Sequence, residues 1–149
     1  GERCLKEIFS KFGKSKVLDA IEDFFEHSHQ KTLAALSQLP KGTWSASDWL
    51  DDDGISDDMI KMAVKVSITD SEFIVDYNES SLQVAGPVNS PYGGTVSMAK
   101  TYFKFLTSRD SPSNHGNYIP LEVKADPGNP LPRHLSYSHI HAMDKNGCI

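Results

Sequence analysis

The spacing of apolar residues changes partway along this chain of 149 residues, and that change limits the folds open to it. From residue 5 to residue 39 apolar residues recur three and four positions apart, which is the spacing of one helix face. From residue 60 to residue 77 they alternate with polar residues, which is the spacing of a strand with one buried face. Because the chain carries one pattern after the other, it is predicted to fold as one α+β unit.

The helical spacing predicts two helices at the start of the chain. The first spans residues 5–12 and ends at Gly13, since a glycine commonly follows the last turn of a helix. The second begins at Ser15, a favourable capping residue, and ends at Leu39 because Pro40 cannot continue a helix. A link of two or three residues between them predicts an αα-hairpin.

The alternating spacing predicts an antiparallel β-hairpin after the helices. Its strands are residues 60–69 and 73–77, and Asp70-Ser71 forms the turn between them. Residues 44–58, between the second helix and the hairpin, are rich in turn-forming residues and are predicted to form a loop.

A third helix and a short strand are predicted after the hairpin. The helix begins at Thr95 and runs to Leu106, because an earlier start would place two glycines in its first turn at about 1 kcal/mol each. The strand spans residues 118–124. Beyond that the periodicity fails, so the domain is expected to cover residues 1–128 and residues 129–149 to form an unstructured tail.

Charge, apolar runs and cysteines exclude several classes of protein. The net charge is −5 and no basic patch stands out, so nucleic-acid binding is not expected. No apolar run approaches the ~18–20 residues of a membrane span. The two cysteines, Cys4 and Cys148, lie at opposite ends of the chain. So few cysteines do not make a disulfide framework, which favours a reducing, cytoplasmic location.

Two clusters have the residue types of metal ligands. The acidic run Asp51-Asp52-Asp53-Gly54 offers oxygen ligands but lacks the spacing of a calcium loop, so a solvated turn is favoured. His139 and His141, with Asp144 and Cys148 nearby, could compose a zinc set, although their spacing matches no established pattern and the segment is expected to be unfolded.

Two further features are candidates for anion binding or proton transfer. Gly93-Gly94-Thr95 before a helix could present N–H groups to an anion, but no Gly-Lys-Ser/Thr follows it, so a plain turn is favoured. His115 could act as a general acid or base, although an exposed loop histidine is the commoner case. No Gly-x-Ser-x-Gly nucleophile motif occurs. The residues alone therefore indicate a domain without an assigned chemistry.

Several motifs in a fixed order are more informative than any single residue. They are Gly42-Thr43-Trp44, Leu50-Asp51-Asp52-Asp53-Gly54, Val75-Asp76-Tyr77, Gln83-Val84-Ala85-Gly86-Pro87-Val88-Asn89, Asp110-Ser111-Pro112-Ser113-Asn114-His115-Gly116 and Ile119-Pro120-Leu121. In this order and spacing the chain resembles the hydantoinase B/oxoprolinase family, over about residues 1–128. Glu79 departs from the pattern, because it stands where the family favours glycine.

The resemblance implies an activity and a partner. Family members work with a hydantoinase A-type subunit, or a fused equivalent, to open cyclic amides such as 5-oxoproline or hydantoins at the cost of ATP, and relatives carboxylate ketones. ATP and a divalent metal are expected for the whole enzyme, and this segment is expected to bind neither. Because family chains are several times longer, the chain is expected to be a central fragment of a B-type subunit, inactive alone. A non-catalytic interaction module that keeps the fold is the alternative.

Three residues in the matching loops are candidates for substrate binding. Asn89 and Asn114 each carry an amide that can donate to and accept from a cyclic amide, and Asp76 could orient either loop. The competing interpretation is structural, since Asn and Asp also stabilise turns through their own backbone. Gly86 and Gly116 are expected to serve backbone geometry only.

Overall fold

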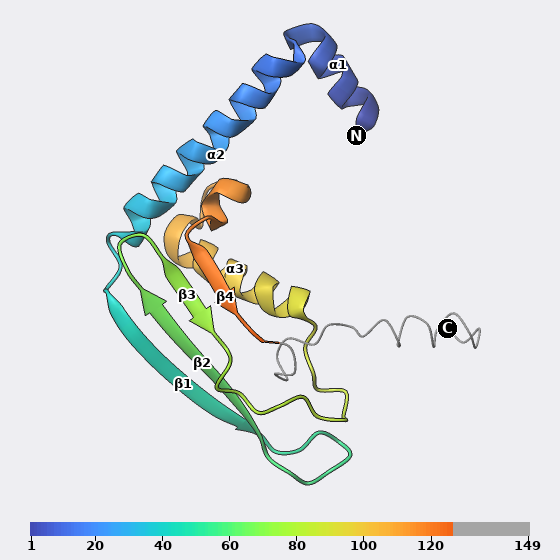
Figure 1. Cartoon of the computed structure of the whole chain (residues 1–149), viewed down its shortest axis with the longest axis vertical. Coiled ribbons are helices and arrows are strands. Elements are labelled where there is room, and N and C mark those ends of the chain that lie inside the picture. Colours follow the sequence, from blue (N-terminus) through green and yellow to red (C-terminus); the bar gives the residue numbers. More distant parts are fainter. Residues whose placement is uncertain (127–149) are drawn as a thin grey trace, which may run out of the picture.

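The computed structural model describes residues 1–126 and shows a helical arm beside a two-layer α+β body (Figure 1). Helices α1 (Glu2–Phe12) and α2 (Lys14–Leu36) come first, followed by strands β1 (Gly42–Leu50), β2 (Ile60–Ile68) and β3 (Phe73–Asp76). Helix α3 (Tyr92–Ser108), the short 3-10 helix η1 (His115–Tyr118) and strand β4 (Leu121–Lys124) complete it. The predicted α+β class is confirmed, and the predicted tail, residues 129–149, lies outside the described residues.

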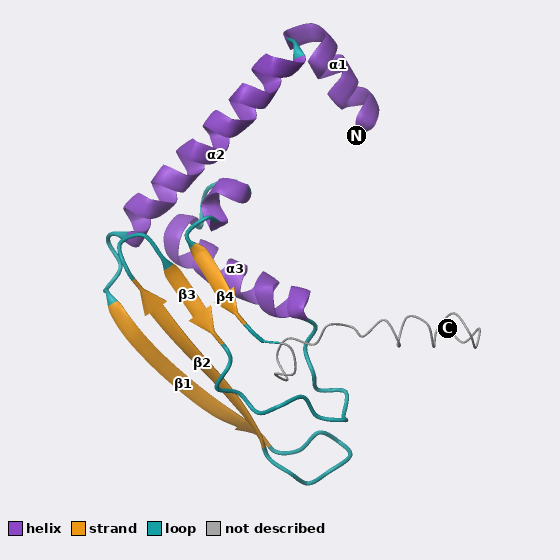
Figure 2. Cartoon of the chain, in the orientation of Figure 1, coloured by secondary structure: helices purple, strands orange, loops and turns teal. Residues whose placement is uncertain are grey.

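The four strands form one mixed sheet in the order β1-β2-β3-β4 (Figure 2). Strands β1, β2 and β3 are antiparallel neighbours, which confirms the predicted hairpin, whereas β4 runs parallel to β3. The crossover from β3 to β4 passes through α3, as parallel neighbours require a long connection.

Strand β1 corrects the prediction that residues 44–58 form a loop. Its composition of Ser, Asp and small residues resembles a turn, yet every residue from Gly42 to Leu50 pairs with β2. Eight of its nine residues are exposed, so this edge strand is held by its ladder to β2 rather than by burial. Local composition therefore misled the prediction, because the partner strand decides the conformation here.

Two further boundaries differ from the prediction. Helix α3 begins at Tyr92 rather than Thr95, with Gly93 and Gly94 in its first turn, because Pro91 supplies the carbonyl that accepts from the N–H groups of Gly94 and Thr95. The predicted strand 118–124 is shorter: residues 115–118 are 3-10 helix and only Leu121–Lys124 is strand.

Helix α2 ends at Leu36, where the Lys41 ammonium caps it. Lys41 Nζ donates to the carbonyl oxygens of Leu36 and Ser37, each at 3.0 Å, and to that of Leu39 at 2.6 Å. These carbonyls lie at or just beyond the end of the helix, where Leu36 O also accepts from Leu39 N at 3.1 Å, so the cation adds a partner to them and complements the negative end of the helix.

The core lies between α3 and the β3–β4 half of the sheet. Its buried residues are Leu36, Phe73, Val75, Ala99 and Phe103. The rings of Phe73 and Phe103 are 5.1 Å apart between centroids. Burying two aromatic side chains against each other is the largest single apolar contribution in so small a core.

Helix α3 leaves the β1–β2 half of the apolar sheet face uncovered. Trp44 and Met62 on that face are 46% and 36% exposed. A four-stranded sheet is about 19 Å wide and a helix about 10 Å across, so one helix covers roughly half of such a face. The chain therefore presents an apolar sheet surface that a second element would normally cover.

Candidate functional site

The loops at one end of the sheet are fastened together by Asp53. They are the 51–59 loop, between β1 and β2, and the 77–91 loop, between β3 and α3. Asp53 is only 3% exposed. One carboxylate oxygen accepts from Ile55 N at 2.9 Å and Ser56 N at 2.7 Å, and the other accepts from Gly86 N at 2.9 Å. We call this contact the Asp53–Gly86 clasp.

Gly86 fits the clasp because it has no side chain. A Cβ atom at this position would overlap the carbonyl oxygen of Asp53. The sequence motifs around residues 50–54 and 83–89 therefore belong to one structural unit, since each supplies one half of the clasp. The solvated turn expected at the acidic run is wrong for Asp53, which is buried because three backbone N–H groups satisfy its carboxylate.

The hydrogen bonds to Asp53 favour its charged form. Backbone N–H groups of Ser56, Ile55 and Gly86, in that order of effect, hold the pKa of the Asp53 carboxyl below its ordinary value of 3.8. The resulting stability is present in full above the unfolded-state pKa and is lost as the pH falls through the lower folded-state pKa.

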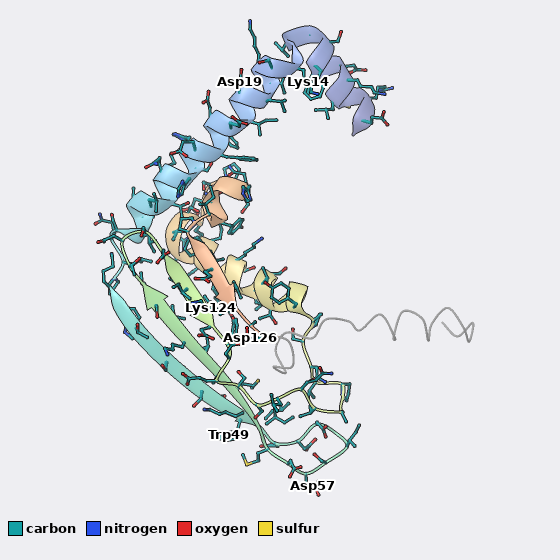
Figure 3. All side chains as sticks on the ribbon, viewed as in Figure 1. Lys14, Asp19, Trp49, Asp57, Lys124 and Asp126 are labelled. Carbon is teal, nitrogen blue, oxygen red and sulfur yellow. The ribbon has the colours of Figure 1, made fainter. Side chains whose placement is uncertain are left out.

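We therefore expect Asp53→Asn to destabilise the chain at neutral pH, because an amide cannot accept all three N–H groups as a carboxylate does. The difference in unfolding free energy between wild type and variant should shrink as the pH falls below 3.8. Urea denaturation across this pH range measures it. Asp57→Asn is the control, because Asp57 is exposed at the tip of the same loop (Figure 3). If the loss of unfolding free energy depended on pH equally in both variants, the stabilising role of the Asp53 carboxylate would be contradicted.

Asn89 uses its amide to close the 77–91 loop. Its Oδ1 accepts from Val84 N at 3.1 Å, while Nδ2 donates to the carbonyl oxygens of Val84 at 2.8 Å and Gly86 at 2.9 Å. The same loop is tied to β2 by Ser80, whose Oγ accepts from Ala63 N at 2.9 Å. Asn89 thus shapes the loop that carries the clasp.

Asp76 lies at the end of β3, where the 77–91 loop begins. Its Oδ1 accepts from Asn78 N at 2.9 Å, which forms a local turn. Glu79 follows with a negative φ, so this turn accepts a residue other than glycine. The Glu79 carboxylate lies 3.7 Å from Lys65 Nζ.

Asn114 holds the other end of the body against α2. Its Nδ2 donates to Ser28 Oγ at 2.7 Å, and Asn117 Nδ2 donates to Thr32 Oγ1 at 3.2 Å. Asn117 and Thr32 are buried, so this polar pair fixes η1 on α2. Gly116 permits the close approach, because a Cβ there would overlap the carbonyl oxygen of Phe25.

The three predicted substrate-binding residues do not form one site in this chain. Asp76 precedes the 77–91 loop and Asn89 lies within it, whereas Asn114 follows the far end of α3. The 17 residues of α3 separate Asn89 from Asn114 by roughly 25 Å of helix. His115, next to Asn114, is exposed and lies edge-on to the Phe25 ring, with 5.7 Å between centroids.

An apolar groove of about 430 Å³ lies between the uncovered sheet face and α3. Its lining residues are Trp44, Val64, Val66, Ile68, Phe73, Val75, Tyr77, Ala99, Tyr102 and Leu106. Burial, followed by repulsion from Tyr102, raises the pKa of Tyr77 above its ordinary value of 10.0, so its phenol stays protonated at neutral pH. Sequence reasoning missed this groove, because it depends on which half of the sheet α3 covers.

The described residues supply no donor set for the divalent metal that the resemblance implies. Within residues 1–126 no three or more His, Cys, Asp or Glu side chains lie together as metal ligands. Asp53 is occupied by backbone donors, and Asp52 Oδ1 accepts from Gly54 N at 2.8 Å. The alternative zinc set around His139 and His141 falls outside the described residues.

The N-terminal turn of α3 resembles an ordinary helix start. The N–H groups of Gly94 and Thr95 donate to Pro91 O, at 2.9 and 3.1 Å, rather than pointing to an open anion site. No helix in residues 1–126 is long and apolar enough to cross a membrane.

Comparison with known proteins relates the chain to much longer ones. The sequence matches the family described as hydantoinase B/oxoprolinase over residues 1–134. It is 32% identical over 137 residues to a Pseudomonas protein (strain NS671) named as the B-type subunit of a D-/L-hydantoinase, covering 82% of this chain. It is 26% identical to an uncharacterised protein of Methanocaldococcus jannaschii, covering 88% of this chain. The chain spans only 22% and 23% of the lengths of these relatives.

Two solved structures share the fold. An ATP-dependent caprolactamase from Pseudomonas jessenii superimposes with a TM-score of 0.77 at 24% identity, covering 91% of this chain and 24% of that chain. A nucleotide-free acetone carboxylase superimposes with a TM-score of 0.73 at 14% identity, covering 88% of this chain and 19% of the carboxylase chain. In both, most of this chain corresponds to less than a quarter of a longer polypeptide.

Proposed function

The chain belongs to the hydantoinase B/oxoprolinase family, and from that premise we propose that it serves as a segment of a B-type subunit in an enzyme that opens cyclic amides at the cost of ATP. The substrate is of the 5-oxoproline or hydantoin class. The observation that carries the proposal is the family match over residues 1–134, which includes both halves of the Asp53–Gly86 clasp.

The chemistry explains why such an enzyme needs ATP. A cyclic amide is stabilised by resonance, so water attacks it slowly. Transfer of the γ-phosphoryl group from ATP to the exocyclic carbonyl oxygen releases ADP and activates the carbonyl carbon toward water. After water adds to that carbon, the ring C–N bond breaks, which frees the amine and leaves an acyl phosphate. A second water molecule converts the acyl phosphate to the carboxylate and phosphate. In this proposal the A-type subunit holds the nucleotide. The sequence agrees with this, because Gly13-Lys14-Ser15 lacks the first glycine of a Gly-x-x-x-x-Gly-Lys-Ser/Thr phosphate loop, the position being Ile8.

The segment's own contribution is a shaped loop and a scaffold. Because the described residues do not fit a metal site, we assign them no step that requires one. The clasp and Asn89 fix the 77–91 loop before any ligand arrives, and Asp76 borders the same loop. We assign this loop to the substrate-facing side of the assembled enzyme, whereas Asn114 positions η1 on α2.

The uncovered sheet face supports the view that the segment works inside an assembly. Trp44 and Met62 are exposed on a face whose other half is a packed core. Water contact with so much apolar surface is unfavourable, so further polypeptide is expected to cover it. We propose an A-type subunit as partner of the whole enzyme and a cytoplasmic location, which the two widely separated cysteines favour.

Two alternatives keep the same fold. A non-catalytic interaction module would retain the subunit contacts without contributing to turnover. The second alternative is a segment of an ATP-dependent ketone carboxylase. The likeness to acetone carboxylase supports it at the level of fold. Adding acetone with bicarbonate in place of the cyclic amide separates the carboxylase from the hydrolase.

A chimeric protein tests the proposal. Residues 1–126 replace the matching segment in the B-type subunit of the Pseudomonas hydantoinase, and the chimera is combined with an A-type subunit. ATP-dependent opening of hydantoin or 5-oxoproline is expected, measured as ADP released per product formed. A chimera carrying Gly86→Ala is the matched control and should lose most of that activity. A folded chimera that binds the A-type subunit without any turnover would favour the interaction module instead.

A further inference from the structure

The apolar groove beside α3 has two walls that meet over β3. One wall is the uncovered face of the sheet, where β1 contributes Trp44 and β2 contributes Val64 and Val66. The other wall is the flank of α3, which contributes Tyr102 and Leu106. All ten residues that line the groove are apolar or aromatic, so it is composed like the space between two layers of a domain.

Helix α3 carries an apolar stripe in addition to the one that faces the sheet. Its buried residues Ala99 and Phe103 already pack on the sheet. Met98, Tyr102 and Leu106 are four residues apart, so they lie along one side of the helix, and they are 52%, 62% and 49% exposed. A surface helix normally carries polar residues away from its single apolar stripe, so this second stripe indicates a helix packed at its side.

The open half of the sheet has room for one helix. Neighbouring strands lie about 4.8 Å apart, so β1 and β2 provide roughly 10 Å, which matches the 8–10 Å between the axes of packed helices. Strand β1 has nine residues, or about 30 Å, which a helix of about 20 residues spans. One helix beside α3 would therefore cover both walls of the groove.

The groove is continuous with the packed core of the body. Phe73, Val75 and Ala99 line the groove and also belong to the buried cluster. A helix seated there would join that same core, and the core of a domain is ordinarily formed within one polypeptide. The chain spans only 22% and 23% of the lengths of its curated relatives, so such polypeptides have ample length to supply the helix.

The arm, which comprises α1 and residues 14–24 of α2, also exposes apolar side chains but does not select an occupant. Its helices diverge from Gly13, whose φ of +84° residues with a side chain rarely adopt, so the predicted αα-hairpin is an open V (Figure 1). The notch between the helices is lined only by residues between 12 and 24. It therefore lacks the link to the core that the groove has.

We propose that the groove receives one amphipathic helix of the same polypeptide, which lies beside α3 on β1 and β2 and comes from the longer B-type subunit outside residues 1–126. Apolar residues three and four positions apart on this helix face Trp44 and Tyr102. The inference rests on the proposed function only in taking the chain as a segment of a B-type subunit, and it requires no turnover.

Photochemical cross-linking from the two walls tests the proposal. The chimeric B-type subunit described above carries benzoylphenylalanine in place of Trp44 or of Tyr102, both aromatic and exposed, and is irradiated without an A-type subunit. Mass spectrometry of the digested subunit identifies the attached peptide. Both probes are expected to attach to one segment of the same polypeptide outside residues 1–126, at residues three or four positions apart or a multiple of one helical turn.

The same probe at Ser45 is the matched control. Ser45 is exposed on β1 and points to the opposite face of the sheet from Trp44, because successive side chains of a strand alternate. Attachment to the identified segment should be at least tenfold lower from Ser45 than from Trp44. Circular dichroism checks that each chimera is folded, and probes at the aligned positions of the intact Pseudomonas subunit repeat the test without the exchanged segment.

Several outcomes would overturn the proposal. They are attachment of the two probes to unrelated segments, attachment only between two copies, attachment only after the A-type subunit is added, and equal attachment from Ser45. Turnover is measured separately on chimeras without a probe. An active chimera with any of these outcomes overturns the helix and leaves the proposed function standing, whereas the expected cross-links in an inactive chimera support the helix while the proposed function fails.

Discussion

Gly86→Ala is expected to destabilise the chain by about 4 kcal/mol or more, a loss seen only when a specific structural feature is broken. The added Cβ overlaps the carbonyl oxygen of Asp53, and backbone cannot move aside as a flexible side chain can. Relief requires the 51–59 and 77–91 loops to separate, which removes the Gly86 N–H from the buried Asp53 carboxylate. Urea denaturation followed by circular dichroism measures the loss.

Gly93→Ala is the matched control for that result. Gly93 lies inside α3 with no atom within 4 Å of the position its Cβ would take. The same substitution should therefore stabilise the chain, by up to about 1 kcal/mol, because alanine is the better helix former. If both variants lost stability by similar amounts, the steric account of the clasp would be wrong.

Phe103→Ala is expected to cost about 3–5 kcal/mol, which is a large share of the roughly 5–15 kcal/mol by which a domain is stable. Phe103 has no exposed surface, and its ring packs on Phe73 in the only large cluster of buried apolar side chains among residues 1–126. Truncation leaves a cavity between α3 and the sheet that the edge of the core cannot fill. Thermal and urea unfolding of the variant check the value.

Phe105→Ala gives the comparison within the same helix. Phe105 is 60% exposed and contacts the Arg109 guanidinium, 5.5 Å from its ring centroid. Its truncation should change the unfolding free energy by less than about 1 kcal/mol. If both alanine variants lost a similar amount of unfolding free energy, the core would not lie between Phe103 and the sheet.

Elements whose structure depends on local apolar spacing could be predicted from the sequence. Both helices of the arm and the β2–β3 hairpin follow directly from the periods of 3.6 and 2. Strand β1 could not, because Ser and Asp side chains conceal its alternation and the β2 ladder fixes it. The β3–β4 pairing could not be predicted either, because parallel strands are joined by a long crossover, which leaves no turn signal in the sequence.

The candidate site was harder to predict, because its contacts join distant parts of the chain. Asp53 and Gly86 are 33 positions apart, and Asn117 and Thr32 are 85 apart. Resemblance to the family pointed to the motifs at residues 50–54 and 83–89, yet it did not show that Asp53 joins the two loops that carry them. The residue types of Asp and Asn suit a ligand or a turn equally well, and only the hydrogen-bond partners distinguish the two.

Turnover by the chain alone tests the central claim most directly, namely that these residues provide scaffold for a larger ATP-dependent catalyst. The purified chain is mixed with ATP, magnesium and 5-oxoproline or hydantoin, and ADP and ring-opened product are measured. The account predicts no ADP or product above the blank without protein, and ATP-coupled ring opening when the same residues are placed in the longer polypeptide together with an A-type partner. Sustained, equimolar formation of ADP and product by the chain alone would contradict it.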